Sequence, residues 1–183
     1  MKKWSMLAVC VIVLATILFL MVDRMTANEL KPGDAAPEFS LVGSDGKTYA
    51  LADFKGKQAV VLAWFPKAFT PGCTTECTAF AREGKLLREF DVAYFTASVD
   101  SPEKNKAFAE SVGADYPILS DPKGEVAREY GVTSLVKPFA SRWTFYIGKD
   151  GKILLIDKNV NTATHAADVA KKLEELKVGK KAQ

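Results

Sequence analysis

Histidine is almost absent from this sequence and cysteine is scarce, which limits the chemistry that the chain can carry. There is one histidine, His165, and there are three cysteines, Cys10, Cys73 and Cys77. A structural zinc site usually takes four cysteine or histidine ligands, so this inventory does not favour one. Because Cys10 lies in an apolar run, where a thiol behaves as a small hydrophobic side chain, the cysteine chemistry reduces to Cys73 and Cys77.

The chain also has no marked excess of positive or negative charge. The net charge is +3, and lysine and glutamate are interspersed along the chain, so we expect no nucleic acid partner. No internal repeat or low-complexity segment is visible. With 183 residues, 48% of them hydrophobic, the chain is long enough for one well-buried core and an appendage.

The appendage is an uncharged apolar run at residues 6–22 that follows Lys2 and Lys3. The run is longer than the usual signal-peptide core of about 7–15 residues, and it is close to the shortest length that spans a membrane. We interpret residues 1–23 as a signal-anchor or transmembrane segment. This assignment predicts a membrane anchor with the following domain on the extracytoplasmic side, periplasmic or extracellular; the alternative is secretion after signal cleavage.

The remaining residues divide into a short connection, one domain and a tail. A polar stretch with proline and glycine makes 24–34 a linker, residues 35–178 form the domain, and 179–183 are a basic tail. Asp-Gly pairs at 45–46 and 150–151 predict two hairpins, and the continuous apolar run at 59–65 predicts a strand covered on both faces.

Strands alternate with helical patterns along the domain. The expected strands are 39–42, 48–51, 59–65, 92–99, 116–119, 143–147 and 153–157, and the expected helices are 74–90, 102–112, 121–130 and 166–176. This order predicts the α/β fold class, as a thioredoxin-like sandwich with a mixed central sheet flanked by helices, preceded by an N-terminal hydrophobic helix.

The most informative segment, residues 64–80 (WFPKAFTPGCTTECTAF), leaves the buried strand, forms a loop and enters a helix. Sites in open α/β sheets form at the carboxyl ends of strands. Cys73 falls at or near the first turn of the helix, where unpaired N–H groups and the helix dipole favour a thiolate. We therefore predict that Cys73 is a nucleophile and that Thr70 offers a hydroxyl to the group it attacks. Pro66 and Pro71 shape the loop.

Cys77 lies one helical turn after Cys73. Positions four apart have Cβ atoms about 5–6 Å apart, whereas a disulfide needs about 3.5–4.5 Å, so a bond requires the first turn to unwind. Such strain suits a catalytic disulfide that forms and is reduced repeatedly. Metal ligands and ordinary core thiols are the alternatives. His165, in an Asn/Thr-rich stretch before the last helix, is interpreted as a solvated residue near the helix cap rather than a catalytic one.

The spacing Pro66-x-x-x-Thr70-x-x-Cys73 resembles the P-x-x-x-T-x-x-C signature of the peroxiredoxins. The surrounding FPKAFTPGCTTEC is similar to the bacterioferritin comigratory protein or peroxiredoxin Q branch. Further matches are GDAAPEF at 33–39, the turn at 45–47, and Arg142 within SRWTFYIGKDGKI. The resemblance implies a thioredoxin-like fold and a thiol-dependent peroxidase for hydrogen peroxide and organic hydroperoxides. It also implies no prosthetic group and recycling by thioredoxin or a thioredoxin-like reductant. We expect a monomer or homodimer.

The resemblance also implies roles for particular residues. Cys73 is the peroxidatic nucleophile, while Thr70 and the Cys73 N–H hold the peroxide oxygens. Arg142 lies beside the sulfur, where it favours the thiolate and stabilises the charge on the leaving oxygen. Pro66 shields the sulfenate from water and from a second oxidation. Glu76 is either the ion-pair partner of Arg142 or a solvated surface residue.

The sequence departs from this branch at the second cysteine. Members with a resolving cysteine in this helix usually have four residues between the two thiols, whereas three separate Cys73 from Cys77. Either Cys77 resolves the sulfenic acid or an external thiol does so in a one-cysteine enzyme.

A second functional class is a membrane-anchored copper-delivery or thiol-disulfide protein of the SCO type, which also carries C-x-x-x-C on this fold. Those proteins have proline after the second cysteine and a histidine before the C-terminal hairpin. Thr78 and Arg142 stand at these places here. A cation beside two thiolates repels copper, which disfavours this alternative. A thioredoxin-type reductase is disfavoured because C-x-x-C is missing.

Overall fold

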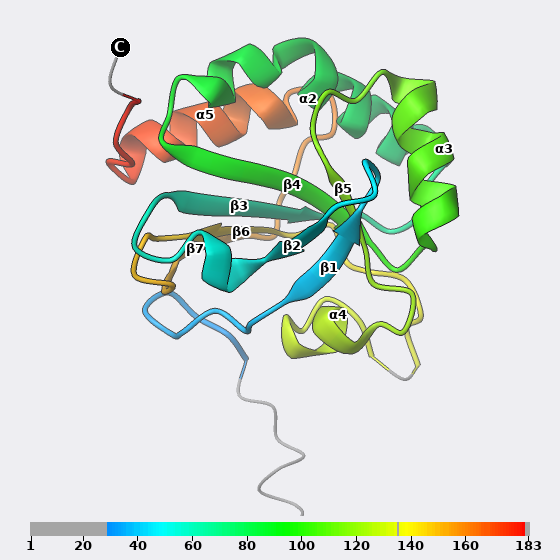
Figure 1. Ribbon diagram of the computed structural model, residues 1–183, viewed down its shortest axis with the longest axis horizontal. Coiled ribbons are helices and arrows are strands. Elements are labelled where there is room, and N and C mark those ends of the chain that lie inside the picture. Colours follow the sequence, from blue (N-terminus) through cyan, green and yellow to red (C-terminus); the bar gives the residue numbers. More distant parts are fainter. Residues whose placement is uncertain (1–28, 135, 182–183) are drawn as a thin grey trace, which may run out of the picture.

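A mixed sheet with helices on both faces forms the centre of the molecule (Figure 1). The structure is a computed structural model that describes residues 29–134 and 136–181. The hydrophobic helix predicted within residues 6–22 lies outside the described residues.

Seven strands form the sheet, in the order β2-β1-β5-β4-β3-β6-β7. The strands are β1 (Ser40–Gly43), β2 (Thr48–Ala50), β3 (Ala59–Trp64), β4 (Val92–Ser98), β5 (Ile118–Ser120), β6 (Thr144–Ile147) and β7 (Ile153–Asp157). β3, β4 and β5 run parallel, whereas β6 pairs with β3 and β1 with β5 in antiparallel fashion. Both predicted hairpins are present, as β1–β2 and β6–β7. The predicted α/β class with a mixed central sheet is therefore confirmed.

The helices cover the two faces unequally. They are α2 (Pro71–Arg88), α3 (Pro102–Val112), α4 (Glu125–Glu129) and α5 (His165–Glu175), with a short 3-10 helix, η1 (Leu51–Asp53). In Figure 1, α2, α3 and α5 lie above the sheet, with α2 and α5 side by side, and α4 lies below it. This pairing of α2 with α5 determines what surrounds the first turn of α2.

β3 is buried along its whole length, as its unbroken apolar sequence predicts. Val61 and Ala63 contribute to the core beneath α2, α3 and α5. Val60, Leu62 and Trp64 contribute to the core on the α4 face. Alternate side chains of β3 thus enter the two cores on opposite faces of the sheet. This packing holds the end of the strand, after which the chain leaves the sheet.

Two helices begin several residues away from their predicted starts, for local reasons. α2 begins earlier than predicted because Pro71 occupies its first position, where a missing N–H costs nothing. α4 begins later because the Asp121 carboxylate accepts the N–H groups of Glu125 (3.1 Å) and Ala127 (2.7 Å) across an intervening turn. In that turn Gly124 has a φ of 64°, a left-handed conformation that favours glycine.

Backbone bonds attach both ends of the described chain to the sheet. The Gly33 N–H donates to the Ile153 carbonyl (2.8 Å), and the Asp91 N–H donates to the Gly179 carbonyl (2.7 Å). The predicted boundaries at residues 34 and 179 stay predictions.

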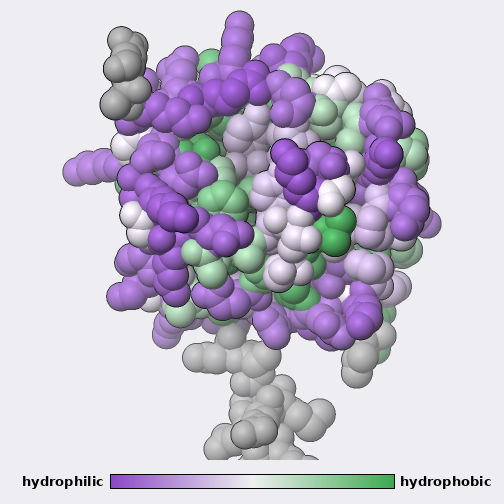
Figure 2. Space-filling view, in the orientation of Figure 1, coloured by the Kyte–Doolittle hydropathy of each residue, from purple (hydrophilic) through white to green (hydrophobic). Residues whose placement is uncertain are grey.

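Hydrophilic side chains cover most of the face seen in Figure 2, with paler and apolar patches between them.

Candidate active site

Cys73 lies in the first turn of α2, directly after the loop that leaves β3. Thr70 is the N-cap residue with extended backbone, and the Thr74 N–H makes a helical bond to the Thr70 carbonyl (2.9 Å). The N–H groups of Gly72 and Cys73 precede that bond, so the helix offers them no carbonyl partner. The thiol is 1% exposed. A buried sulfur therefore lies at the positive end of an 18-residue helix.

The loop before Cys73 is held from several sides. The Ala68 N–H donates to the Asp100 carboxylate (2.8 Å), which follows β4. Phe69 has a φ of 66°, which is strained for an aromatic residue, and its ring contacts Phe108 of α3 edge-on at 5.1 Å between centroids. This turn directs the chain from the sheet into Thr70 and α2.

Arg142 reaches the thiol because of the register of β6 against β3. Ala63 pairs with Thr144, so the residues before Thr144 lie beside the end of β3 and the loop that follows it. Nη2 of Arg142 is 3.3 Å from the Cys73 sulfur, and Nη1 forms an ion pair with Glu76. Of the two interpretations of Glu76, the ion-pair partner is correct: its side chain is completely buried.

The other predicted residues, Thr70 and Pro66, lie in the loop that leads into this turn. The Thr70 hydroxyl donates a hydrogen bond to the Lys67 carbonyl (2.9 Å), so its oxygen can still accept a hydrogen bond from another molecule. Pro66 is half-buried at the start of the loop. Gly72 was not singled out from the sequence, yet a Cβ there would lie 3.4 Å from Nη2 of Arg142. Glycine thus leaves room for the guanidinium.

Cys77 lies deeper in the same helix. It is completely buried, and its backbone carbonyl accepts the Tyr116 hydroxyl (3.0 Å). Burial raises the pKa of the Cys77 thiol to about 12. Both cysteines are free thiols. Cys77 is therefore a neutral thiol at physiological pH while this packing lasts.

The interpretation of His165 as a solvated residue is wrong. His165 is the first residue of α5 and is 1% exposed, because α5 packs on α2. Its Nδ1 lies 2.7 Å from Oε1 of Glu76, and its Nε2 lies 2.8 Å from Oγ1 of Thr144. Its ring meets Phe80 edge-on, with 4.8 Å between centroids. The polar sequence before α5 gave no signal of this burial, since it results from contact with a distant helix.

The burial of His165 predicts a pH-dependent stability. Burial lowers the pKa of His165 from 6.5 to about 4. Between these values the unfolded chain binds the proton and the folded chain does not, so stability falls as the pH falls through this window. The full effect is about 3 kcal/mol. Urea unfolding of wild type and His165→Asn at pH 7 and pH 4.5 measures it. Lowering the pH from 7 to 4.5 should reduce the free energy of unfolding of wild type more than that of His165→Asn. The same difference between the two proteins at both pH values would contradict the prediction.

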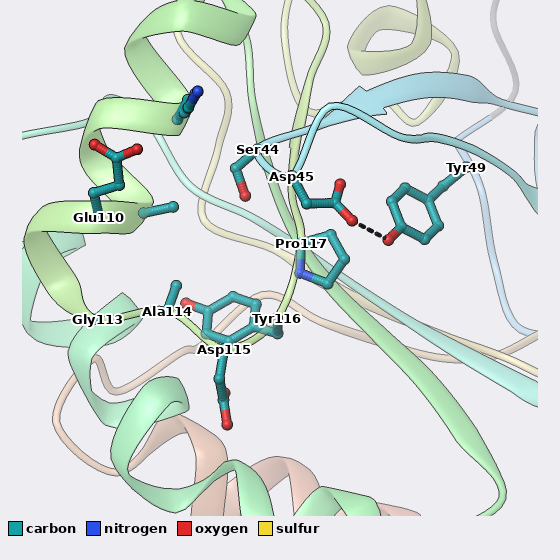
Figure 3. A pocket seen from close by; sticks show the side chains of 11 residues that line it. Ser44, Asp45, Tyr49, Glu110, Gly113, Ala114, Asp115, Tyr116 and Pro117 are labelled. Atoms are coloured by element: carbon teal, nitrogen blue, oxygen red, sulfur yellow. Dashed lines mark hydrogen bonds between the residues drawn. The ribbon is translucent and has the colours of Figure 1, made fainter.

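The surface also has hollows that do not contain the thiol. The one in Figure 3 has a volume of about 370 Å³ and lies between α3 and the β1–β2 hairpin. The Tyr49 hydroxyl donates to the Asp45 carboxylate there (2.8 Å). None of the predicted site residues lines this hollow. Within residues 29–134 and 136–181, no group of three or more His, Cys, Asp or Glu side chains could hold a metal ion.

The chain is similar to known proteins over most of its length. The AhpC/TSA family matches residues 32–156. Peroxiredoxin Bcp of Escherichia coli (strain K12) is 36% identical over 154 residues, which cover 81% of this chain and 98% of that protein. The chain belongs to the peroxiredoxins. Peroxiredoxin Bcp of Bacillus subtilis (strain 168) is 33% identical over 150 residues, covering 79% of this peroxiredoxin and 95% of that relative.

Solved structures agree with the fold of this peroxiredoxin. The crystal structure of peroxidoxin BcpB from Mycobacterium tuberculosis superposes with a TM-score of 0.72 at 33% identity, covering 80% of this chain and 97% of that one. The fold is thus the thioredoxin-like α/β fold. As a peroxiredoxin the protein is a thiol-dependent peroxidase, an oxidoreductase, and the SCO-type alternative is not favoured.

The predicted location is overturned. Within the described ranges, 29–134 and 136–181, no helix is long and apolar enough to cross a membrane. The relatives are peroxiredoxins of the Bcp type, and their matches cover 95–98% of their own length, so they offer no parallel for an anchor. Neither the membrane-anchored, extracytoplasmic location nor the secreted alternative is retained.

Proposed function

We propose that this peroxiredoxin reduces hydrogen peroxide and organic hydroperoxides with Cys73 as the peroxidatic nucleophile. The observation that carries the assignment is the 3.3 Å contact between Nη2 of Arg142 and the Cys73 sulfur, in the first turn of α2. A fixed cation and a helix N-terminus together favour the thiolate, which is the nucleophilic form.

In the first step the Cys73 thiolate attacks one oxygen of a hydroperoxide ROOH. The S–O bond forms as the O–O bond breaks, so the cysteine is oxidised to sulfenic acid, and the leaving alkoxide takes up a proton to become ROH. Hydrogen peroxide gives water in the same step. The electrons come from the sulfur, and no metal or other cofactor takes part in this balance.

Several groups around the first turn of α2 support this step. Because the Thr70 hydroxyl already donates to the Lys67 carbonyl, its oxygen is oriented to accept a hydrogen bond from the hydroperoxide O–H. Arg142 and the Cys73 N–H face the oxygens on which negative charge grows, which stabilises the transition state more than the ground state. Pro66 limits access of water to the sulfenate.

Aromatic side chains near the loop support organic hydroperoxides as substrates. Phe69 is 52% exposed and precedes Thr70 directly. Phe139 is 45% exposed, and the Lys67 ammonium lies over its ring, with Nζ 5.2 Å from the ring centroid. These rings offer apolar surface to an alkyl group, which hydrogen peroxide lacks.

Peroxide consumption by the full-length protein tests the proposal. Hydrogen peroxide or cumene hydroperoxide is supplied with thioredoxin and thioredoxin reductase as the reducing system. We expect catalytic turnover that requires both peroxide and reductant. Absence of turnover with thioredoxin and with small dithiols alike would remove the proposed reaction.

We further propose that Cys77 resolves the sulfenic acid of Cys73. Its sulfur attacks that of Cys73, a disulfide forms, water leaves, and a thioredoxin-like dithiol then reduces the disulfide by thiol exchange. The packing opposes this step in the reduced state, since Cys77 is completely buried and its thiol is neutral. The first turns of α2 must therefore open after oxidation.

This opening gives a prediction for the oxidised protein. Peroxide treatment should produce an intrachain Cys73–Cys77 disulfide, and amide exchange across residues 74–82 should rise at least about tenfold because the helix loses its bonds. Mass spectrometry and hydrogen exchange measure the two effects. Reduction by thioredoxin should restore the slow exchange. A sulfenic or mixed-disulfide Cys73 beside an unmodified Cys77 would instead identify a one-cysteine enzyme.

A further inference from the structure

A continuous chain of polar contacts links the candidate thiol to α5. Arg142 contacts the Cys73 sulfur through Nη2 and the Glu76 carboxylate through Nη1. The second oxygen of Glu76 contacts Nδ1 of His165, whose Nε2 contacts the Thr144 hydroxyl. These residues come from α2, β6 and its preceding turn, and α5, so the contacts join three separate elements.

Because Glu76 is buried, its carboxylate needs both of its partners, Arg142 and His165, to pair its two oxygens. Glu76 and Thr144 are 0% exposed and His165 is 1% exposed, so water cannot replace a lost contact. A buried carboxylate is tolerated only when its oxygens are paired. Arg142 occupies one oxygen and His165 the other. Without the imidazole, one oxygen is left unpaired, and the carboxylate must rotate or take up a proton, which weakens its hold on Arg142.

The hydrogen positions follow from the chemistry of the partners. Because burial lowers the pKa of His165 to about 4, its ring is neutral at physiological pH and only one of its two nitrogens carries a hydrogen. A carboxylate only accepts, so the hydrogen is on Nδ1, which donates to Glu76. Nε2 then accepts the Thr144 hydroxyl. The other charged groups that act on the ring are Asp157 of β7, with Asp168 and Lys172 of α5.

We propose that His165 is a positioning residue of the thiol site, which holds Glu76, and through it Arg142, in the orientation that presents the guanidinium to the Cys73 sulfur. The inference rests on the proposed roles of Cys73 and Arg142. It adds a requirement from α5, an element that does not itself touch the sulfur. A histidine that only fastened α5 to α2 would affect folding and leave the reactivity of the thiol unchanged.

The test uses full-length protein with Cys10→Ser and Cys77→Ser, which leaves Cys73 as the only thiol. In this background His165→Leu removes the donor at similar bulk, whereas His165→Asn retains an N–H donor close to the position of Nδ1. Val169→Ala is the matched control, because Val169 is buried in the same helix and lies outside the polar chain. Thr144→Val, which removes the hydroxyl that fixes the ring, is a second variant in case His165→Leu does not fold.

Two measurements separate positioning from folding. The rate of iodoacetamide alkylation against pH reports the thiolate fraction of Cys73 without requiring peroxidase activity. The single-turnover rate with hydrogen peroxide reports the first chemical step. We expect about tenfold slower reaction in both for His165→Leu at neutral pH, about threefold for Thr144→Val, and rates near the background for His165→Asn and Val169→Ala.

Three results would overturn the inference. The first is an unchanged alkylation rate in folded His165→Leu or Thr144→Val. The second is an equal loss of rate in His165→Leu and His165→Asn. The third is a loss of rate in Val169→Ala as large as that in His165→Leu. Failure of the proposed function has a different signature: the background protein then reacts with peroxide no faster than a small thiol does, whatever residue stands at 165.

Discussion

Replacing Cys73 with serine is expected to reduce peroxide turnover to below about 1% of the wild-type rate while the fold persists. The side chain changes by one atom at a site where the sulfur supplies the electrons, and a hydroxyl in the same place is not ionised at neutral pH. The position lies in the first turn of α2, so the helix does not depend on the thiol for its hydrogen bonds.

Steady-state peroxide consumption and circular dichroism together measure this effect. Cys77→Ser is the matched control in a single-turnover reaction of the reduced protein with hydrogen peroxide, because it also replaces a buried α2 thiol by a hydroxyl and should retain the first oxidation step. Turnover of Cys73→Ser above a few per cent of wild type would mean that another group reduces the peroxide.

Replacing Arg142 with alanine is expected to slow the reaction with peroxide by about 10²–10³-fold. The substitution removes the cation 3.3 Å from the sulfur and also leaves the buried Glu76 without its ion-pair partner. Both consequences disfavour a negative thiolate, and the missing guanidinium no longer stabilises the leaving oxygen. Alkylation of Cys73 by iodoacetamide at neutral pH should therefore be slower as well.

Rapid-mixing kinetics of the reduced protein with hydrogen peroxide separate this step from recycling. Arg142→Lys is the informative comparison, since it keeps a positive charge but cannot contact sulfur and carboxylate at once with a planar fork. We expect it to recover part of the rate. Equal rates for wild type and Arg142→Ala at neutral pH would remove Arg142 from the site.

The features that are local in sequence could be predicted, and the thiol site is largely of this kind. The apolar run of β3, the loop and the first turn of α2 follow one another without a break, so Cys73 and Thr70 could be placed before the structure was known. The two hairpins have Asp-Gly turns. Arg142 required the family resemblance, because the β3–β6 register that brings it to the sulfur joins strands far apart in the chain.

Contacts between distant elements could not be predicted in the same way. His165 follows a run of small polar residues, which indicates a solvent-exposed start of a helix, and nothing in that stretch encodes the burial that α2 provides. Glu76 was left between two interpretations for the same reason. Buried polar pairs depend on which helix faces which, and that information is spread over the apolar faces of both helices.

The packing of α5 on α2 has a consequence for the synthesis of the protein. The chain is made from its N-terminus, and His165 follows Glu76 by 89 residues and Arg142 follows Cys73 by 69. A nascent chain that has already formed β3 and α2 therefore holds a cysteine without its cation and a carboxylate without its imidazole. With the roles proposed for Arg142 and His165, the reactive thiol is completed only when the last described helix has been synthesised and has docked, and we expect partly made chains to carry an ordinary cysteine rather than a peroxide-reactive one.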